Sequence, residues 1–247
     1  MYKRQEYDFA IIYFGLPRSI KQTYQTHIDN IFQTLKNKNL TYKTFLHTWQ
    51  INDNKQIINE NVISQEIDYN EYKLLNPDFY KIDSQEQYLD NINMDDYFYK
   101  DVFDTIGNCN EGEWLPFLII NHLCALESQK RGFEMVENFI EEGNKFKYVM
   151  FIRHDVYIFN KLPLQSILLN TFDISIPNDE HYEGYNDRFA ILNYEKAHIY
   201  GKRINEIAEF RKTNGRIVSE KYVKFIINKY NFKINYMNFK FILKRPS

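Results

Sequence analysis

The stretch that decides the fold is Phe146–Phe159, which reads FKYVMFIRHDVYIF. Residues Lys147–Ile152 are mostly apolar and either β-branched or aromatic, a composition typical of a strand buried on both faces. Arg153, His154 and Asp155 follow at once, and the sequence then becomes apolar again. Because burying an unpaired charge is costly, we expect the strand to end at the rim of a polar site. Arg153 and Asp155 share one side of the chain because they are two residues apart; an ordinary structural Arg–Asp pair is the alternative.

Composition narrows the class of protein. The 247 residues suffice for one large domain, and the aromatic content of 17%, with 20 Tyr and 20 Phe, is typical of a packed interior. A net charge of −2 provides no basic field for nucleic acid. Two cysteines, Cys109 and Cys124, are too few for a disulfide scaffold or a zinc cluster, and we expect Cys124 to be a buried free thiol.

The chain shows no signal peptide and no apolar run of ~18 residues, the length that a membrane span needs. These patterns predict a soluble, cytoplasmic protein without a membrane span. They leave its oligomeric state open.

The first element is an apolar run, Phe9–Phe14, which predicts a strand. The loop that follows it consists of Gly15, Leu16, Pro17, Arg18 and Ser19. Residues 20–38 then repeat apolar side chains at helical spacing. A strand, a Gly/Pro loop and a helix open many nucleotide-binding α/β domains, in which backbone N–H groups at the helix start hold a phosphate. Arg18 could add a fork-shaped donor, whereas an ordinary βα turn without a ligand is the alternative.

A second predicted strand, Leu40–Trp49, ends in His47, Thr48 and Trp49. The carboxyl ends of strands in α/β sheets are where ligands bind. Trp49 could stack on a base there, or it could serve only in packing.

Residues 50–113 are rich in Asn, Asp, Glu and Tyr and show no long period. We interpret them as a structured insertion with a short strand over Val62–Tyr69 and a helix over Gln85–Phe98. After it, apolar spacing over Trp114–Ile140 predicts a long helix that is interrupted near Gly132.

The rest of the chain alternates between short strands and helices. The predicted elements are a short helix over Leu162–Leu169, a strand over Phe172–Pro177, a helix over Tyr194–Arg211, a helix over Glu220–Tyr230 capped by Ser219, and one or two strands over Phe232–Leu243. This alternation predicts an α/β fold, with a mostly parallel central sheet flanked by helices, in a single domain over residues 1–247.

Four polar segments are expected to meet at one edge of the sheet. They are Gly15–Ser19, His47–Trp49, Arg153–Asp155 and Asp179–Arg188. Because ligands of such sheets collect at the carboxyl ends of the strands, a nucleotide-type ligand is the first hypothesis.

At these segments the sequence resembles a group of glycosyltransferases with the GT-A fold, found among bacterial polysaccharide enzymes and large DNA viruses, in which Arg-x-Asp takes the place of Asp-x-Asp. The resemblance rests on Gly-Leu-Pro-Arg after the first strand, on Leu46–Trp49, on the Arg-x-Asp of the strand Tyr148–Val156 and on Asn186–Ala190. Each motif is short, and their order and spacing together carry the resemblance, which covers most of the chain outside residues 50–113.

This resemblance implies a GT-A-like sheet and the transfer of a sugar from a nucleotide-sugar donor to a hydroxyl of a glycan or other acceptor. In such enzymes Asp-x-Asp holds Mn²⁺ or Mg²⁺, which neutralises the diphosphate leaving group. Here Arg153 stands at the first acid. Asp155 would keep the metal while Arg153 contacts phosphate, or cationic side chains would stabilise the leaving group alone.

The resemblance also assigns the other roles. Donor-binding residues would be Gly15, Leu16, Pro17, Arg18, His47, Thr48, Trp49, Arg153, His154 and Asp155. Asp187 would act with Arg153 in catalysis, as the general base if the reaction inverts the anomeric centre. Asp179 and Arg188 would bind sugar hydroxyls. For Asp187, an ordinary loop cap before a strand is the alternative.

Two other functions remain open at this stage. The segment Gly15–Ser19 also resembles the phosphate loop of sulfotransferases, and Arg153 suits their second phosphate contact. However, Ile20 and Lys21 stand where that family has Gly and Thr, and a β-branched Ile hinders the backbone from wrapping a phosphate. A non-catalytic descendant that binds a nucleotide sugar or a protein is the third hypothesis.

Overall fold

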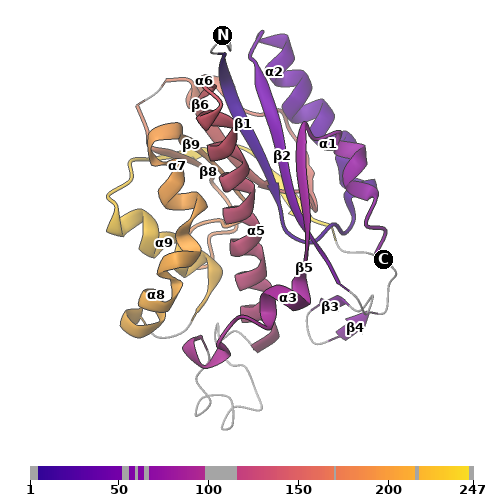
Figure 1. The fold of residues 1–247 in the computed structure, drawn as a ribbon. Coiled ribbons are helices and arrows are strands. Elements are labelled where there is room, and N and C mark those ends of the chain that lie inside the picture. The colour runs from indigo at the N-terminus through magenta and orange to yellow at the C-terminus, as the bar shows by residue number, and fades with distance from the viewer. Residues whose placement is uncertain are drawn as a thin grey trace.

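A seven-stranded sheet runs through the middle of the protein (Figure 1). The computed structural model describes residues 5–51, 56–58, 61–63, 67–97, 116–169, 171–214 and 217–244. In their order across the sheet, the strands are β10 (Ile234–Met237), β8 (Ile174–Pro177), β9 (Phe189–Asn193), β6 (Lys145–Arg153), β1 (Glu6–Phe14), β2 (Tyr42–Gln50) and β5 (Phe79–Ser84). Of these strands, β9 alone runs antiparallel to its neighbours, β6 and β8. The prediction of a single α/β domain with a mostly parallel central sheet flanked by helices is confirmed.

Helices and short strands complete the described chain. The helical segments are α1 (Ile20–His27), the π-helical η1 (Ile28–Phe32), α2 (Gln33–Asn37), η2 (Glu71–Leu75), α3 (Gln85–Leu89), η3 (Met94–Asp96), α5 (Pro116–Glu141), α6 (Leu164–Ile167), α7 (Tyr194–Gly201), η4 (Arg203–Glu206), α8 (Ile207–Asn214) and α9 (Ser219–Lys229). Two small antiparallel sheets join β7 (Val156–Ile158) to β11 (Phe241–Leu243) and β3 (Gln56–Ile58) to β4 (Asn61–Ile63).

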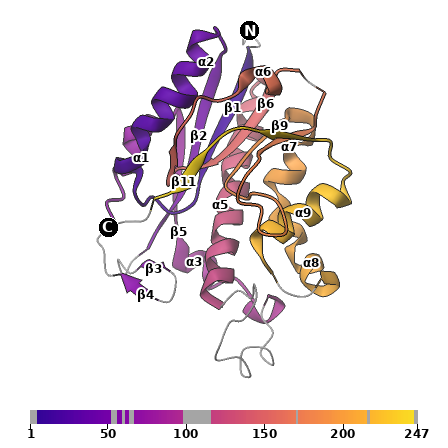
Figure 2. The same cartoon turned by 180° about the vertical axis from the view of Figure 1, so that it is seen from behind.

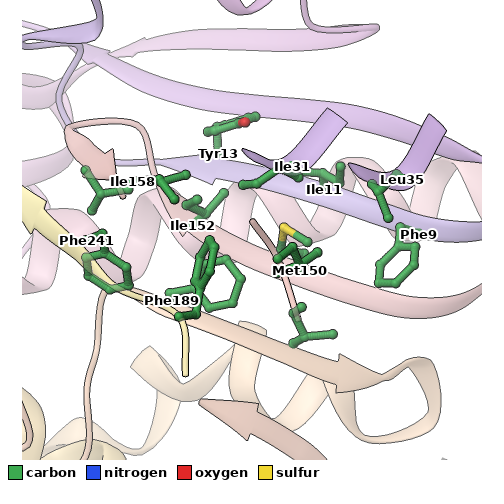
Figure 3. Close-up of a cluster of buried hydrophobic side chains, with 14 of the residues drawn as sticks. Phe9, Ile11, Tyr13, Ile31, Leu35, Met150, Ile152, Ile158, Phe189 and Phe241 are labelled. Atoms are coloured by element: carbon green, nitrogen blue, oxygen red, sulfur yellow. The ribbon is translucent and has the colours of Figure 1, made fainter. Parts of the chain in front are cut away.

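Side chains that alternate along the central strands build a core on each face of the sheet. On β1, Phe9, Ile11 and Tyr13 pack on the face that α1, η1 and α2 cover, where Ile31 and Leu35 meet them (Figure 3). The same core includes residues of β7 and β11, which lie on the α1–α2 side of the sheet (Figure 2).

Helices α5, α7 and α9 cover the opposite face of the sheet (Figure 1). The residues that β1 and β6 contribute to this second core are Tyr7, Ala10, Ile12, Phe14, Phe146, Val149 and Phe151. The predicted central strand is therefore buried on both faces, as its apolar run indicated.

Helix α5 is continuous over 26 residues, so the predicted interruption near Gly132 is wrong. The glycine has a different role. A Cβ atom at Gly132 would lie 2.5 Å from Cγ2 of Ile12 on β1. Gly132 therefore lets the helix backbone come close to the sheet, at a cost in helix propensity of about 1 kcal/mol.

Polar side chains of α1 and η1 hydrogen-bond the segment that follows Arg153. Thr23 Oγ1 donates to the carbonyl oxygen of His154 at 2.7 Å, and Asn30 Nδ2 donates to that of Ile158 at 3.1 Å. Between them, Nε2 of His27 lies 2.9 Å from the carbonyl oxygen of Val156. Because β7 pairs with β11 on one edge only, these contacts satisfy its other edge and fix the chain just after β6.

Four histidines, His27, His47, His122 and His154, are buried. Burial is the main cause that lowers their pKa, to about 4 for His27, His47 and His154 and to about 3 for His122. All four are therefore neutral in the folded protein at pH 7.

The described part of residues 50–113 differs from the prediction in three ways. Strand β5, which the sequence analysis did not predict, pairs with β2 as the edge strand of the central sheet. Of the predicted strand over Val62–Tyr69, residues 62 and 63 belong to β4, whereas residues 67–69 are not in a strand and residues 64–66 lie outside the described chain. Residues 98–113 lie outside the described part of the chain.

The predicted helix over Gln85–Phe98 is also shorter than expected, since α3 ends at Leu89. Asn side chains compete with the helix just beyond it. Asn91 Nδ2 donates to the carbonyl oxygen of Gln87 at 2.6 Å, and Asn93 Oδ1 accepts the backbone N–H of Asp95 at 3.2 Å. Such local side-chain bonds favour turns over a continued helix.

Cys124 is a buried free thiol, as predicted, and burial raises its pKa to about 12. Cys109 lies outside the described residues. Within the described ranges, no helix combines the length and the apolarity needed to cross a membrane.

Gly132→Ala should lower the free energy of unfolding by about 1–3 kcal/mol, because the new methyl group overpacks the contact between α5 and Ile12. Urea denaturation measures this change. Glu134→Ala, on the half-exposed side of the same helix, is the matched control and should change stability by less than about 0.5 kcal/mol. Equal stability of Gly132→Ala and the wild type would contradict the close approach.

The four buried histidines should make the protein less stable in mild acid. Their pKa values in the folded state lie below the ordinary 6.5, so the unfolded state binds protons first as the pH falls. Their contribution is complete above pH 6.5 and is lost as the pH falls towards their lower pKa values in the folded state. Urea denaturation at pH 7, 6 and 5 tests this loss of stability. Ring resonances of these histidines that titrate near pH 6.5 would contradict it.

Candidate functional site

The sheet topology brings all four predicted polar segments to one edge, where His47–Trp49 of β2 is buried and the other three form the polar site. Gly15–Ser19 follows the carboxyl end of β1, and Arg153–Asp155 follows that of β6, its parallel neighbour. The loop 178–188 leaves the carboxyl end of β8 and enters the amino end of the antiparallel β9. One reversed strand therefore delivers Asp187 and Arg188 to the edge at which the parallel strands end.

Asp155 is the centre of this edge. Its carboxylate accepts two hydrogen bonds from Arg153, from Nε to Oδ1 at 2.9 Å and from Nη2 to Oδ2 at 2.6 Å. Arg18 Nε donates to the same Oδ2 at 3.2 Å. The Asp155 side chain is only 2% exposed, and the two guanidinium groups compensate its buried charge. The spacing of two residues between Arg153 and Asp155 thus produces the shared side that the sequence predicted.

Arg188 lies beside Arg153 across the strands. The backbone N–H of Arg153 donates to the carbonyl oxygen of Arg188 at 3.1 Å. The Arg188 guanidinium forms an ion pair with Glu180, and its Nε lies 3.9 Å from Oδ1 of Asp187. Burial and the neighbouring Arg153 lower the pKa of Arg188. Burial also acts to lower the pKa of Arg153, but Asp155 and the other nearby acids raise it above its ordinary value.

Glu220, in the first turn of α9, joins the cluster as a further acid. Burial, and then the charge of Asp187, raise the pKa of the Glu220 carboxyl. Ser219 Oγ donates to Glu220 Oε2 at 2.8 Å rather than capping α9, whose N-cap is Val218, so the predicted cap role of Ser219 is wrong. Asp187 and Glu220 thus form an acidic pair beside Arg188.

The loop 178–188 is held in shape by its own side chains. Asn186 Nδ2 donates to the carbonyl oxygen of Asp179 at 3.2 Å, and Asn186 Oδ1 accepts the backbone N–H of Arg188 at 3.0 Å. Oδ1 of Asp179 accepts the N–H of Glu180 at 2.8 Å. Asp179, predicted to bind sugar hydroxyls, is exposed and closes this turn.

The same loop is docked on α9. A Cβ atom at Gly184 would lie 2.0 Å from the carbonyl group of Glu220, so only glycine fits there. The backbone N–H of Tyr185 donates to that carbonyl oxygen at 3.0 Å. The position of Asp187 relative to Glu220 therefore depends on this close contact.

His47, predicted to bind the donor, is fully buried and positions the Gly15 loop instead. Its Nε2 lies 3.1 Å from Asp83 Oδ2, and its Nδ1 lies 2.8 Å from Ser128 Oγ on α5. Ser128 Oγ accepts the backbone N–H of Gly15 at 2.9 Å. Because His47 is neutral and a carboxylate only accepts, Nε2–H of His47 donates to Asp83. The single hydroxyl proton of Ser128 is shared between Nδ1 of His47 and the His47 carbonyl oxygen, which lies 2.9 Å from Oγ.

Thr48 and His154, also predicted to contact the donor, are buried as well. Thr48 Oγ1 donates to the carbonyl oxygen of Gly15 at 2.8 Å, from beneath the loop. His154 is 1% exposed, and its pKa is lowered mainly by burial. In this structure both residues support the site from within, because side chains on alternate positions of a strand end face the core.

Trp49 does not offer a face for a base. It is 1% exposed, and its Nε1 donates to the carbonyl oxygen of Cys124 at 2.9 Å. Tyr88 stacks on its ring with centroids 5.2 Å apart, and the Arg131 guanidinium lies 4.9 Å from the ring centroid. The packing alternative for Trp49 is therefore the one that the structure supports.

The Gly15–Ser19 loop has left-handed backbone at both ends, with φ of 107° at Gly15 and 62° at Ser19. Leu16 and Arg18 are partly exposed, whereas Pro17 is buried. The start of α1, the expected phosphate site, already holds a carboxylate, since the N–H of Lys21 donates to Glu71 Oε2 at 3.0 Å. Arg18 is thus the side chain of this loop that contacts the rest of the site.

A divalent metal does not fit Asp155 in this arrangement. Both carboxylate oxygens accept hydrogen bonds from guanidinium groups, and two positive charges this close repel a third cation. Among the described residues, no group of three or more His, Cys, Asp and Glu side chains could hold a metal ion. The residues present at Asp155 fit an anion beside the arginines better than Mn²⁺ or Mg²⁺.

Several residues of the site escaped the sequence analysis. Glu180 follows the predicted polar end of a strand, but its pairing with Arg188 depends on the loop conformation. Asp83 and Arg131 lie on elements that pack together only in the fold, and their side chains form an ion pair. Ser128 could have been identified from the sequence, because it is a polar residue within the apolar spacing of a long helix.

The sequence matches no family model, and no curated protein matches it. Solved structures similar to this chain include mouse xyloside xylosyltransferase 1 in its apo form (TM-score 0.42, 9% identity, covering 94% of this chain and 85% of that one). A glycosyltransferase involved in the glycosylation of the major capsid of PBCV-1 has a TM-score of 0.41 at 8% identity and covers 94% of this chain and 81% of that one. A197 from STIV has a TM-score of 0.36 at 8% identity and covers 99% of this chain and 87% of that one. TM-scores of this size do not establish a shared activity.

Proposed function

We propose that the protein is a glycosyltransferase that moves a sugar from a nucleotide-sugar donor to a hydroxyl of a glycan or other acceptor. The observation that carries this proposal is the separation of charge in the site. Arg18 and Arg153 both bind the carboxylate of Asp155 on the β1 and β6 side. Asp187 and Glu220 form an acidic pair on the β9 and α9 side.

The cationic half of the site, formed by Arg18 and Arg153, suits a diphosphate. When the bond between the sugar and the diphosphate breaks, negative charge develops on the leaving oxygen, and fixed guanidinium groups stabilise it without reorganisation. Arg153 uses Nε and Nη2 for Asp155, and its Nη1 has no hydrogen-bond partner among the described residues. We infer that the arginines, rather than a divalent ion, neutralise the leaving group.

The acidic half of the site, formed by Asp187 and Glu220, suits an acceptor hydroxyl. In an inverting transfer, Asp187 takes the proton of the hydroxyl while the acceptor oxygen forms the new bond to the anomeric carbon and the nucleoside diphosphate leaves. Burial and the charge of Asp187 raise the pKa of the neighbouring Glu220. Arg188, paired with Glu180, lies between this half and Arg153.

The sulfotransferase hypothesis is less favoured. It needs a phosphate at the start of α1, where the N–H of Lys21 already donates to the carboxylate of Glu71. It also assigns no role to Asp187 and Glu220.

Nucleotide binding tests the proposed donor site. Thermal shift with nucleoside diphosphates and nucleotide sugars, each in EDTA and in Mn²⁺, should identify a ligand that raises the melting temperature by mass action, and EDTA should not abolish the shift. Arg153→Gln should lose most of it. Lys43→Gln, which breaks a more exposed ion pair with Asp78 near the opposite edge of the sheet, is the control and should retain the shift. No response to any nucleotide would contradict the proposal.

The variant Asp155→Asn distinguishes between a donor site built on arginines and one built on a metal ion. The variant should lose about 3 kcal/mol of stability, because two partly buried guanidinium groups lose their shared carboxylate. Relative to its own unliganded melting temperature, it should bind the nucleoside diphosphate in EDTA at least as tightly as the wild type, since a competing anion is gone. Wild-type binding that requires Mn²⁺ and disappears in Asp155→Asn would instead place a metal at Asp155.

A further inference from the structure

Three aromatic rings gather beside the acidic half of the site. His181 and Tyr185 belong to the loop 178–188, and Tyr236 lies on β10, next to Ile176 of β8. The ring centroid of His181 lies 5.8 Å from those of both Tyr185 and Tyr236, and the two tyrosine centroids are 6.3 Å apart. We call these three residues the aromatic cluster.

The aromatic cluster reaches the surface. Tyr236 is 48% exposed, although it lies on a strand of the central sheet, and Tyr182, in the same loop, is 61% exposed. Exposed aromatic side chains that pack on one another are uncommon on a free protein surface and often mark a binding site.

The cluster and the acidic half of the site are one rigid unit. The backbone N–H of Asn186 donates to Nδ1 of His181 at 3.3 Å, and Asn186 Oδ1 accepts the N–H of Arg188. Left-handed backbone at Glu180, Tyr182 and Glu183 shows that the surrounding contacts hold the loop in a costly conformation. A ligand on the rings is therefore held at a fixed position relative to Asp187.

The surroundings of the rings indicate the chemistry of that ligand. Asp179 is exposed in the same loop, and Glu180 and Glu183 pair with Arg188 and Lys221, so the loop has no excess of positive charge that would attract nucleic acid or another polyanion. A purely apolar partner would bury the exposed Asp179 carboxylate and the hydroxyls of Tyr185 and Tyr236, which hydrogen-bond each other, away from water. A pyranose ring suits both features, because its C–H face packs on an aromatic ring while its hydroxyls form hydrogen bonds at its edge.

We propose that the aromatic cluster binds a sugar ring of a neutral acceptor glycan and presents one of its hydroxyl groups to Asp187. The binding of the glycan follows from the cluster itself. Its role as an acceptor rests on the proposed function.

A glycan array tests the binding. The wild-type chain is applied to neutral oligosaccharides that end in hexose, pentose, deoxyhexose or N-acetylhexosamine units, and the best ligand is then titrated by calorimetry. Tyr236→Ala should bind that ligand about 10-fold more weakly, as expected for the loss of one aromatic contact. Tyr80→Ala is the matched control, because Tyr80 is 56% exposed on β5, at the opposite side of the sheet, and should bind like the wild type.

The outcomes distinguish this inference from the proposed function. If the wild type binds no glycan on the array, the aromatic site is overturned, even if nucleotide sugars bind. Equal affinity of Tyr236→Ala and the wild type for the glycan would also overturn it. A preference for sulfated or phosphorylated polymers would overturn it as well. Glycan binding that Tyr236→Ala weakens, in a protein that responds to no nucleotide, would support the site and contradict the transfer reaction. Tyr236→Ala should leave the thermal shift with nucleoside diphosphate unchanged.

Discussion

One buried carboxylate joins the parts of the candidate site. Asp155 binds Arg153 from β6 and Arg18 from the loop after β1, and a buried acid with two guanidinium partners is stable only while both remain in place. The backbone of Arg153 in turn binds that of Arg188, at the entry to β9. Three segments that are far apart in the sequence therefore depend on the charge balance around one side chain.

Helix α5 supplies the support behind this ion cluster. Gly132 allows the helix to approach β1, and Ser128, one turn earlier, reaches the backbone of Gly15 and the ring of His47. Both contacts need the same close packing of helix and sheet. The position of the Gly15 loop, and with it that of Arg18, is thus coupled to the core rather than to the loop sequence alone.

The two halves of the site differ in how they are built. The cationic half is attached to parallel strands in the centre of the sheet, where the backbone is fully hydrogen-bonded and the side chains are packed on both faces. The acidic half belongs to a long loop that α9 and its own Asn186 hold in place. A site of this kind keeps one group of charges fixed by the sheet, while the loop determines what can lie opposite.

Much of the architecture followed from the sequence. Apolar runs of strand length, alternating with amphipathic helices, predicted the α/β class, and charged residues directly after the buried run at Lys147–Ile152 predicted a polar site at the end of β6. The spacing of Arg153 and Asp155 predicted that they share a side. These features are local, because the periodicity of the chain and the cost of burying charge act within a few residues.

Only the tertiary structure decided which strand-end residues are exposed. His47, Thr48 and Trp49 look like Arg153–Asp155 in the sequence, yet α5 and the Gly15 loop cover them, and they became supporting residues. Strand β5 and the pairing of Glu180 with Arg188 were equally hidden. The physical reason is that periodicity reports which face of an element is apolar, whereas burial at a strand end depends on which distant element packs there.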